Sequence, residues 1–411
     1  MSKRTSLIGA LCCMAIVGCG GGGPSAPATE PVTPAGAAGS ADDHLVAALA
    51  NVGGQQTVQL VDPSGAGVAV LAAKTTNIVT PNAVSLDAST QVRTVLAAPW
   101  AYFVSDGRLY EVSLKKSDTH TPVQISSMTT GCYVAGAVPL TLDASSAWIL
   151  VGTGGQDGNC LTYNDNGYAL VRSHSAATTD ARTLPTGITW PQGATSLTDD
   201  AGNVLAIPAI DYSTSTPRLV LLDPSSLQIA RSVANGSGAS TYFALGRAPD
   251  SVRAMYVRFN NTLRRLSWTD TSASLSDALY TFQNSTTGNV GVSDASGLYF
   301  QDGAVLLHVT GSGLATTVAD LGGSSGIIQN IHLTSGHIVL IRSGTSLVSI
   351  NKATGATKTW GPYQSGSALW LYGVHGDAAY FTEQTTSAGV NLHALHLDRD
   401  TDTTLMSGGA F

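Results

Sequence analysis

Short apolar runs alternate with small polar turns along most of the chain, from about residue 44 to the C-terminus. Ser293-Asp294-Ala295-Ser296-Gly297-Leu298-Tyr299-Phe300 is a typical segment, in which an Asp- and Gly-containing turn precedes aromatic and branched residues. Leu221-Leu222-Asp223-Pro224-Ser225-Ser226 is a second type, an apolar strand that runs into a turn where Asp caps its own backbone. Helical periodicity is scarce. The pattern therefore predicts an all-β protein.

The strand-and-turn unit recurs at spacings of 41 to 58 residues, near Asp62, Lys115, Ser173, Asp223, Thr269, Thr310, Asn351 and Asp398. This period is typical of a four-stranded propeller blade, and Asp-Gly hairpin turns such as Asp302-Gly303 fall inside the units. One small sheet cannot bury both of its faces, whereas a closed ring of sheets can. We therefore expect a β-propeller of seven or eight four-stranded blades over residues 44–411. A β-sandwich or a solenoid is the structural alternative.

One unit has a closer likeness to a known repeat. The stretch from Leu347 through the turn Asn351-Lys352-Ala353-Thr354-Gly355 to Trp360 resembles the tryptophan-docking repeat of quinoprotein-type and YVTN-like propellers. The resemblance covers one blade and implies the architecture. Quinoprotein dehydrogenases also carry a vicinal disulfide, and the only adjacent cysteines are Cys12 and Cys13, near the N-terminus. No cofactor is expected.

The N-terminus reads as an export signal. Lys3 and Arg4 precede an apolar stretch that is too short to span a bilayer, and Ile16-Val17-Gly18-Cys19 resembles the lipobox of bacterial lipoproteins. The resemblance implies a signal peptide over residues 1–18, with lipid, such as palmitate, attached at Cys19. Residues 19–43 are then a flexible Gly/Pro/Ala-rich linker. Gly20 after the cysteine implies anchoring in the outer membrane of a Gram-negative bacterium. An ordinary secretory signal cut near Ala35 to Ala41 is the alternative.

Composition narrows the partners. The chain has 20 basic and 27 acidic residues, and only 11% of residues are charged, so nucleic acid is not an expected partner. Besides the cysteines of the N-terminal region, the chain has Cys132 and Cys160. In an oxidising compartment these two are expected to form a disulfide, with two separate buried thiols as the alternative.

Motifs for catalysis or metal binding are weak. Gly322-Gly323-Ser324-Ser325-Gly326 fits the pattern of a nucleophile elbow, but residues 327–333 read as a strand where that motif needs a helix. The alternating Asp398, Asp400 and Asp402 read as a solvated turn. His332, His337 and His375 could approach one another, but they lack a recognisable ligand pattern. No residue is therefore assigned a catalytic or metal-binding role.

Aromatic residues are the more plausible contact residues. Trp190, Tyr363, Trp370 and Tyr372 are weak candidates for ligand binding, while packing between blades is the favoured interpretation for Trp360 and Trp370. We therefore expect a non-enzymatic, lipid-anchored propeller that presents a binding face to a protein or a glycan in the cell envelope. One alternative is a hydrolase or lyase with a site in the central channel. Another is an outer-membrane assembly scaffold, by resemblance to the lipidated propeller of the barrel-insertion machinery.

Overall fold

A computed structural model describes most of the chain after residue 44. The described ranges are 45–52, 55–63, 68–71, 75–77, 100–105, 108–124, 132–142, 147–155, 167–172, 182–183, 185–189, 197–198, 204–239, 242–284, 291–311, 313–322, 328–361, 363, 368–385 and 389–409. They belong to one compact unit, Ala38–Phe411. Within them the chain forms strands and no helix, and hence no helix long and apolar enough to cross a membrane.

The strands form small sheets in chain order. The first sheet contains β1 (Val46–Val52), β2 (Gln55–Val61) and β3 (Val68–Leu71). The second contains β4 (Thr75–Asn77), β5 (Trp100–Ser105), β6 (Arg108–Ser113) and β7 (Val123–Gln124). The third contains β8 (Cys132–Leu142), β9 (Ala147–Gly155), β10 (Gly167–Arg172) and β11 (Arg182–Thr183).

A ten-stranded sheet follows. Its first part contains β12 (Ile188–Thr189), β13 (Leu197–Thr198), β14 (Val204–Asp211), β15 (Arg218–Leu222) and β16 (Ile229–Ser237). Its second part contains β17 (Tyr242–Arg247), β18 (Ala254–Phe259), β19 (Thr262–Trp268), β20 (Ala273–Leu275) and β21 (Tyr280–Thr281). A short parallel pairing of β16 with β20 joins the two parts.

Three four-stranded antiparallel sheets complete the chain. The first contains β22 (Gly291–Asp294), β23 (Gly297–Asp302), β24 (Val305–Val309) and β25 (Thr316–Asp320). The next contains β26 (Ile328–Leu333), β27 (His337–Arg342), β28 (Ser346–Asn351) and β29 (Thr357–Trp360). The last contains β30 (Ala368–His375), β31 (Ala378–Thr385), β32 (Gly389–His396) and β33 (Thr401–Gly409).

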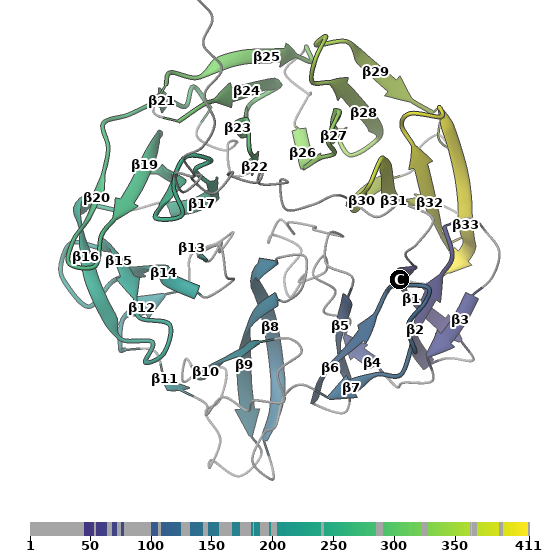
Figure 1. Cartoon of the computed structure of the whole chain (residues 1–411), viewed down its shortest axis with the longest axis horizontal. Helices are drawn as coiled ribbons and strands as arrows, with labels where there is room; N and C mark the ends of the chain where they lie inside the picture. The colour runs from purple at the N-terminus through teal and green to yellow at the C-terminus, as the bar shows by residue number, and fades with distance from the viewer. Residues whose placement is uncertain are drawn as a thin grey trace, which may run out of the picture. The chain divides into compact units, whose positions relative to one another are not determined.

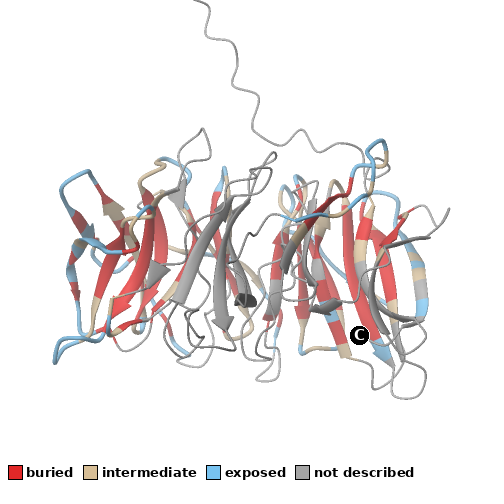
Figure 2. Ribbon diagram, turned by 90° about the horizontal axis from the view of Figure 1, so that it is seen from below, coloured by how far each residue is buried: buried red, intermediate tan, exposed pale blue. Residues whose placement is uncertain are grey.

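The sheet of β22 to β25 buries both of its faces against the neighbouring sheets. Phe300 of β23 packs in one cluster with Tyr256 of β18, whereas the adjacent Tyr299 packs in another with Ile338 of β27. Because successive strand residues point to opposite faces, this alternation carries the core from sheet to sheet. Figure 2 shows the result, with buried residues in the strands and exposed residues mainly in the turns.

The first sheet of the chain closes on the last. Val46 and Val61 share a buried cluster with Tyr380 and Ala394 of the last sheet, while Leu60, on the opposite face, packs with β6 residues. Figure 1 shows the sheets of this unit following one another around a common centre. This succession confirms the predicted all-β propeller and excludes a sandwich or a solenoid. The number of blades, seven or eight, stays a prediction because the ten-stranded sheet joins two groups of strands.

The predicted turns are confirmed where the structure describes them. The backbone N–H groups of Ser225 and Ser226 both donate to Asp223 Oδ1. Those of Ala353 and Thr354 donate in the same way to Asn351 Oδ1. These Asx caps end the strands where the sequence places the turns.

Candidate functional site

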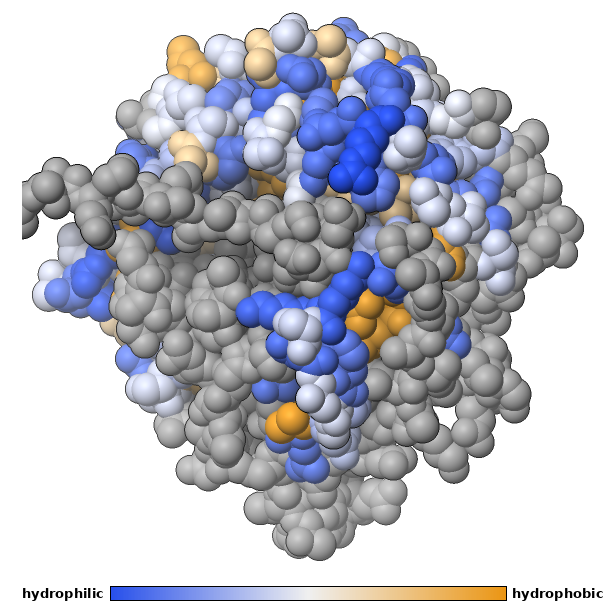
Figure 3. Space-filling model, turned by 45° about the vertical axis from the view of Figure 1, so that its right-hand side comes forward, coloured by the Kyte–Doolittle hydropathy of each residue, from blue (hydrophilic) through white to orange (hydrophobic). Residues whose placement is uncertain are grey.

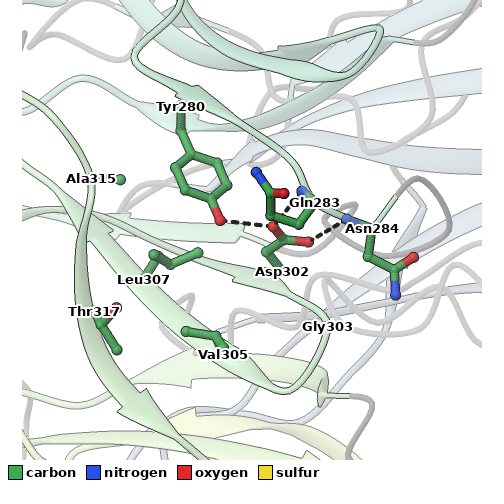
Figure 4. A pocket seen from close by; sticks show the side chains of 9 residues that line it. All are labelled: Tyr280, Gln283, Asn284, Asp302, Gly303, Val305, Leu307, Ala315 and Thr317. Atoms are coloured by element: carbon green, nitrogen blue, oxygen red, sulfur yellow. Dashed lines mark hydrogen bonds between the residues drawn. The ribbon is translucent and has the colours of Figure 1, made fainter. Parts of the chain in front are cut away.

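A cavity of about 610 Å³ opens beside the hairpin of β23 and β24 (Figure 4). One wall is formed by β21 and the segment that follows it, and the other by the sheet of β23, β24 and β25. The lining residues are Tyr280, Gln283, Asn284, Asp302, Gly303, Val305, Leu307, Ala315 and Thr317. The cavity thus lies at the junction of two neighbouring sheets.

Asp302 is the acidic residue of this lining, and it is only 6% exposed. Its Oδ2 accepts hydrogen bonds from the Tyr280 hydroxyl at 2.8 Å and from the Gln283 N–H at 2.7 Å. Its Oδ1 accepts one from the Asn284 N–H at 3.0 Å. A carboxylate oxygen has two lone pairs, so Oδ2 is fully used and Oδ1 accepts one hydrogen bond fewer than it can.

The hairpin geometry positions this carboxylate. Asp302 ends β23 and pairs with Val305, the first residue of β24. Gly303 between them has a φ of 64°, in the left-handed region that glycine adopts without steric cost. The Asp-Gly turn predicted from the sequence therefore also holds the acidic side chain at the cavity wall.

A buried positive charge, that of Arg258, interacts with the Asp302 carboxylate. Arg258 is 2% exposed, and its guanidinium lies 4.6 Å from the centroid of the Phe282 ring. Burial lowers the pKa of Arg258, and the Asp302 carboxylate opposes that shift. Burial and the hydrogen bond to Asp302 raise the pKa of Tyr280 to about 12, so its hydroxyl stays protonated at neutral pH.

The remaining lining combines amides and a hydroxyl with an apolar wall. Val305, Leu307 and Ala315 form the apolar part, while Gln283, Asn284 and Thr317 supply neutral hydrogen-bonding groups (Figure 4). Such a lining suits a neutral, polar molecule that also has an apolar face.

A second polar cluster lies inside the last sheet and belongs to the core. His393 Nδ1 lies 3.1 Å from Asp402 Oδ1, and its Nε2 lies 3.6 Å from Glu383 Oε2. Tyr363 and the stacked Phe381 cover the imidazole. Burial, reinforced by the neighbouring Asp402 and Glu383 carboxylates, raises the pKa of Tyr363. Because His393 and Glu383 are buried, we interpret this cluster as structural.

The described part of the chain also contains one group able to hold a metal ion, formed by His337, Asp377 and Asp398. The histidine grouping considered from the sequence is different. His332 is buried in β26, and the side chain of His375 lies outside the described residues. Asp398 was interpreted as part of a solvated turn, and the structure brings it to His337 and Asp377.

Several residues singled out in the sequence fall outside the described ranges. Cys19, Cys160 and Trp190 are among them, and of Cys132 and Tyr372 only the backbone is described, in β8 and β30. The predicted disulfide and lipid attachment therefore stay predictions. For Gly322-Gly323-Ser324-Ser325-Gly326, only Gly322 is described, but Ile328–Leu333 is a strand as expected.

The other aromatic candidates lie away from the cavity. Trp360 packs against a core shared by the last two sheets, which confirms packing between blades, and it donates a 2.8 Å hydrogen bond to Ser349 Oγ within its own sheet. Trp370 is 51% exposed, so the expectation of core packing was wrong for this residue. Figure 3 shows one face, where the described surface is largely hydrophilic with separate apolar spots. Neither tryptophan lines the cavity, and nor does Tyr363.

Comparison with known proteins shows similar folds among solved structures but assigns the chain to no family. No protein-family model matches the chain, and no curated protein matches its sequence. The solved structures similar to it include dihydro-heme d1 dehydrogenase NirN, with a TM-score of 0.52 and 10% identity over 93% of this chain and 77% of that chain. AztD from Citrobacter koseri has a TM-score of 0.51 and 9% identity over 89% of this chain and 94% of that chain. Virginiamycin B lyase from Staphylococcus aureus has a TM-score of 0.43 and 13% identity over 69% of this chain and 86% of that chain.

The expectation of a non-enzymatic propeller finds no support in these comparisons and is not kept. The similar structures include enzymes by name, among them NirN, virginiamycin B lyase, a puromycin hydrolase and a prolyl endopeptidase. The chain spans about half the length of two of these proteins, covering 55% of the puromycin hydrolase and 49% of the prolyl endopeptidase. At 13% identity or less, these similarities show the propeller fold alone.

Proposed function

We propose that this chain is an exported enzyme that hydrolyses a neutral acyl compound bound in the Tyr280–Asp302 cavity. One observation carries the proposal: a nearly buried carboxylate, fixed by three donors, forms part of the wall of an open cavity. Aspartate is one of the residue types that transfer protons in enzymes when its carboxylate is held within reach of the substrate.

Asp302 would act as the general base in this reaction. It takes a proton from a bound water as the water oxygen attacks the carbonyl carbon, and it returns the proton to the leaving group as the acyl bond breaks. Tyr280 and the backbone N–H groups of Gln283 and Asn284 hold the carboxylate in one orientation. Tyr280 is therefore a positioning residue.

The substrate class follows from the lining. Glycoside hydrolysis ordinarily needs a pair of carboxyl groups, and among the described residues that line this cavity Asp302 alone is acidic. An ester or an amide needs one base and hydrogen-bonding groups for its carbonyl oxygen. The amide side chains beside Asp302 support a neutral acyl substrate.

A panel of chromogenic compounds tests this proposal. The full chain is incubated with p-nitrophenyl acetate, aminoacyl p-nitroanilides and p-nitrophenyl glycosides, beside Asp302→Asn and the matched Asp320→Asn. Asp320 lies in the same sheet and outside the cavity lining. We expect turnover of an ester or an anilide, lost in Asp302→Asn and kept in Asp320→Asn. Glycoside turnover alone, or no turnover of any compound, would overturn the proposal.

We also propose that the enzyme is held in the cell envelope by lipid on Cys19, with a disulfide between Cys132 and Cys160. The lipobox-like sequence and the two cysteines in an exported chain support this. Cys19→Ala should abolish lipid labelling and release the protein from membranes, whereas continued membrane association would contradict the anchor. Mass spectrometry without reduction should detect the linked cysteine peptides, and two free thiols would exclude the disulfide.

A further inference from the structure

Three turns of the last two sheets bring potential metal ligands together. His337 begins β27, Asp377 lies between β30 and β31, and Asp398 lies between β32 and β33. One ligand atom from each residue can be chosen so that all three lie within 4.8 Å of one another. None of these residues lines the Tyr280–Asp302 cavity, so the inference is independent of the proposed function.

The imidazole of His337 provides the main evidence. Its Nδ1 atom is buried and has no hydrogen-bond partner. The Asp377 Oδ1 atom lies 3.7 Å away, which is too far for a hydrogen bond. A buried nitrogen without a partner is costly, and an unoccupied ion site is one of its ordinary explanations.

The distance between His337 Nδ1 and Asp377 Oδ1 fits a small cation. Bonds of roughly 2.0 to 2.2 Å to nitrogen and oxygen at tetrahedral angles place two ligand atoms about 3.3 to 3.6 Å apart. The observed 3.7 Å between His337 Nδ1 and Asp377 Oδ1 lies close to this separation. A direct hydrogen bond would have drawn the two atoms to about 3 Å.

The backbone around Asp377 orients its carboxylate for this purpose. The Asp398 N–H donates a hydrogen bond to Asp377 Oδ2, which leaves Oδ1 as the oxygen nearest His337. Outer hydrogen bonds of this kind fix metal-binding carboxylates. A cation would offset the negative charge of the two neighbouring carboxylates, Asp377 and Asp398.

We propose that His337, Asp377 and Asp398 form a binding site for one first-row divalent metal ion, zinc by preference. One nitrogen and two carboxylate ligands suit zinc, whereas calcium takes six to eight oxygen ligands. Because His337 lies in the sheet of β26 to β29 and both aspartates in the sheet of β30 to β33, the ion ties two neighbouring sheets together. Three protein ligands leave the fourth position to water.

The site is tested by measuring metal binding. The full chain is purified without a histidine tag and is first treated with EDTA to remove bound metal. Isothermal titration with ZnCl₂, and with CaCl₂ for comparison, is run on the wild type, His337→Gln, Asp377→Asn and Asp398→Asn. Asp400→Asn is the matched control, because Asp400 lies two residues further along the same turn and pairs with Lys358. Thermal unfolding in EDTA shows which variants fold.

We expect one zinc ion per chain, a Tm that rises with zinc, and affinity lowered at least tenfold in each of the three ligand variants. Asp400→Asn should bind zinc like the wild type. Absence of zinc binding, preferential calcium binding, or unchanged affinity in His337→Gln would overturn the proposal. If Asp377→Asn fails to fold, the zinc affinity of Asp398→Asn becomes the test, because the Asp398 side chain is exposed and its replacement should not disturb packing. Unchanged affinity in that variant would overturn the proposal.

Discussion

The Tyr280 hydroxyl donates a 2.8 Å hydrogen bond to the Asp302 carboxylate, and this bond links β21 with β23 of the neighbouring sheet. The Tyr280 ring also meets Phe282 and Phe300 edge to face, with centroids 5.5 Å apart in each pair. One residue thus contributes both to the packing between sheets and to the orientation of the proposed base.

Tyr280→Phe should weaken the hold on Asp302 and leave the packing between the sheets in place. The change keeps the ring contacts and removes one of three donors to a buried carboxylate, so we expect the free energy of unfolding to fall by about 1 to 3 kcal/mol. Urea denaturation measures this loss. Tyr212→Phe is the control because Tyr212 is exposed, and an equal effect of both changes would contradict the structural role of the bond.

Closure of the ring predicts coupling between the first and last sheets. Val61 and Leu392 share one buried cluster, whereas Val339 belongs to another. Val61→Ala and Leu392→Ala should each destabilise the protein, by about 1 to 3 and 2 to 5 kcal/mol. Their combined effect should depart from additivity by at least about 0.5 kcal/mol in a double-mutant cycle. The Val61→Ala and Val339→Ala pair should be additive, and additivity in both cycles would argue against closure.

Acid should destabilise the sheet of β14 and β15 through Asp211. This carboxylate is fully buried, and Arg218 Nη2 lies 2.8 Å from its Oδ2. Burial raises the pKa of Asp211, but hydrogen bonds from Ser213 and Arg218 outweigh it and lower the pKa below the usual 3.8. The unfolded chain therefore binds this proton first, and stability is lost as the pH falls below about 4.

Asp211→Asn should remove that dependence. We expect the variant to be less stable than the wild type by about 1 to 3 kcal/mol at pH 7, because a charge-assisted hydrogen bond is lost. The difference in the free energy of unfolding between the wild type and the variant should be smaller at pH 3 than at pH 7. Urea unfolding at the two pH values measures it. The exposed Asp277→Asn is the control, and a difference that does not change with pH would contradict the assignment.

The sequence predicts the strands and turns well because these depend on local chemistry. The caps at Asp223 and Asn351 and the strand at Leu298 to Phe300 all follow from residue types within a few positions. The propeller follows from their spacing. Local patterns suffice for this part of the fold.

The candidate site depends on contacts between sheets, which a local pattern does not specify. Asp302-Gly303 reads as a hairpin turn, and nothing near it indicates that Tyr280 and Asn284 will reach its carboxylate from another sheet. His337 and Asp377 likewise come from separate sheets. The signal in the sequence that could have directed attention to this region is an acidic residue, Asp302, directly after the strand-forming run Leu298-Tyr299-Phe300.

The most direct test of the proposed function is to measure kcat and KM separately for Asp302→Asn and the wild type. The substrate is the ester or anilide that the wild type turns over fastest. Loss of a general base should lower kcat by about 10² to 10⁴-fold, with KM within roughly threefold of the wild-type value. Asparagine can accept at only one of the two positions where Asp302 accepts hydrogen bonds, and its NH₂ group would face a donor at the other, so urea unfolding of the variant is measured beside its kinetics. An unchanged kcat/KM, or a rise in KM with kcat intact, would contradict a catalytic role for Asp302.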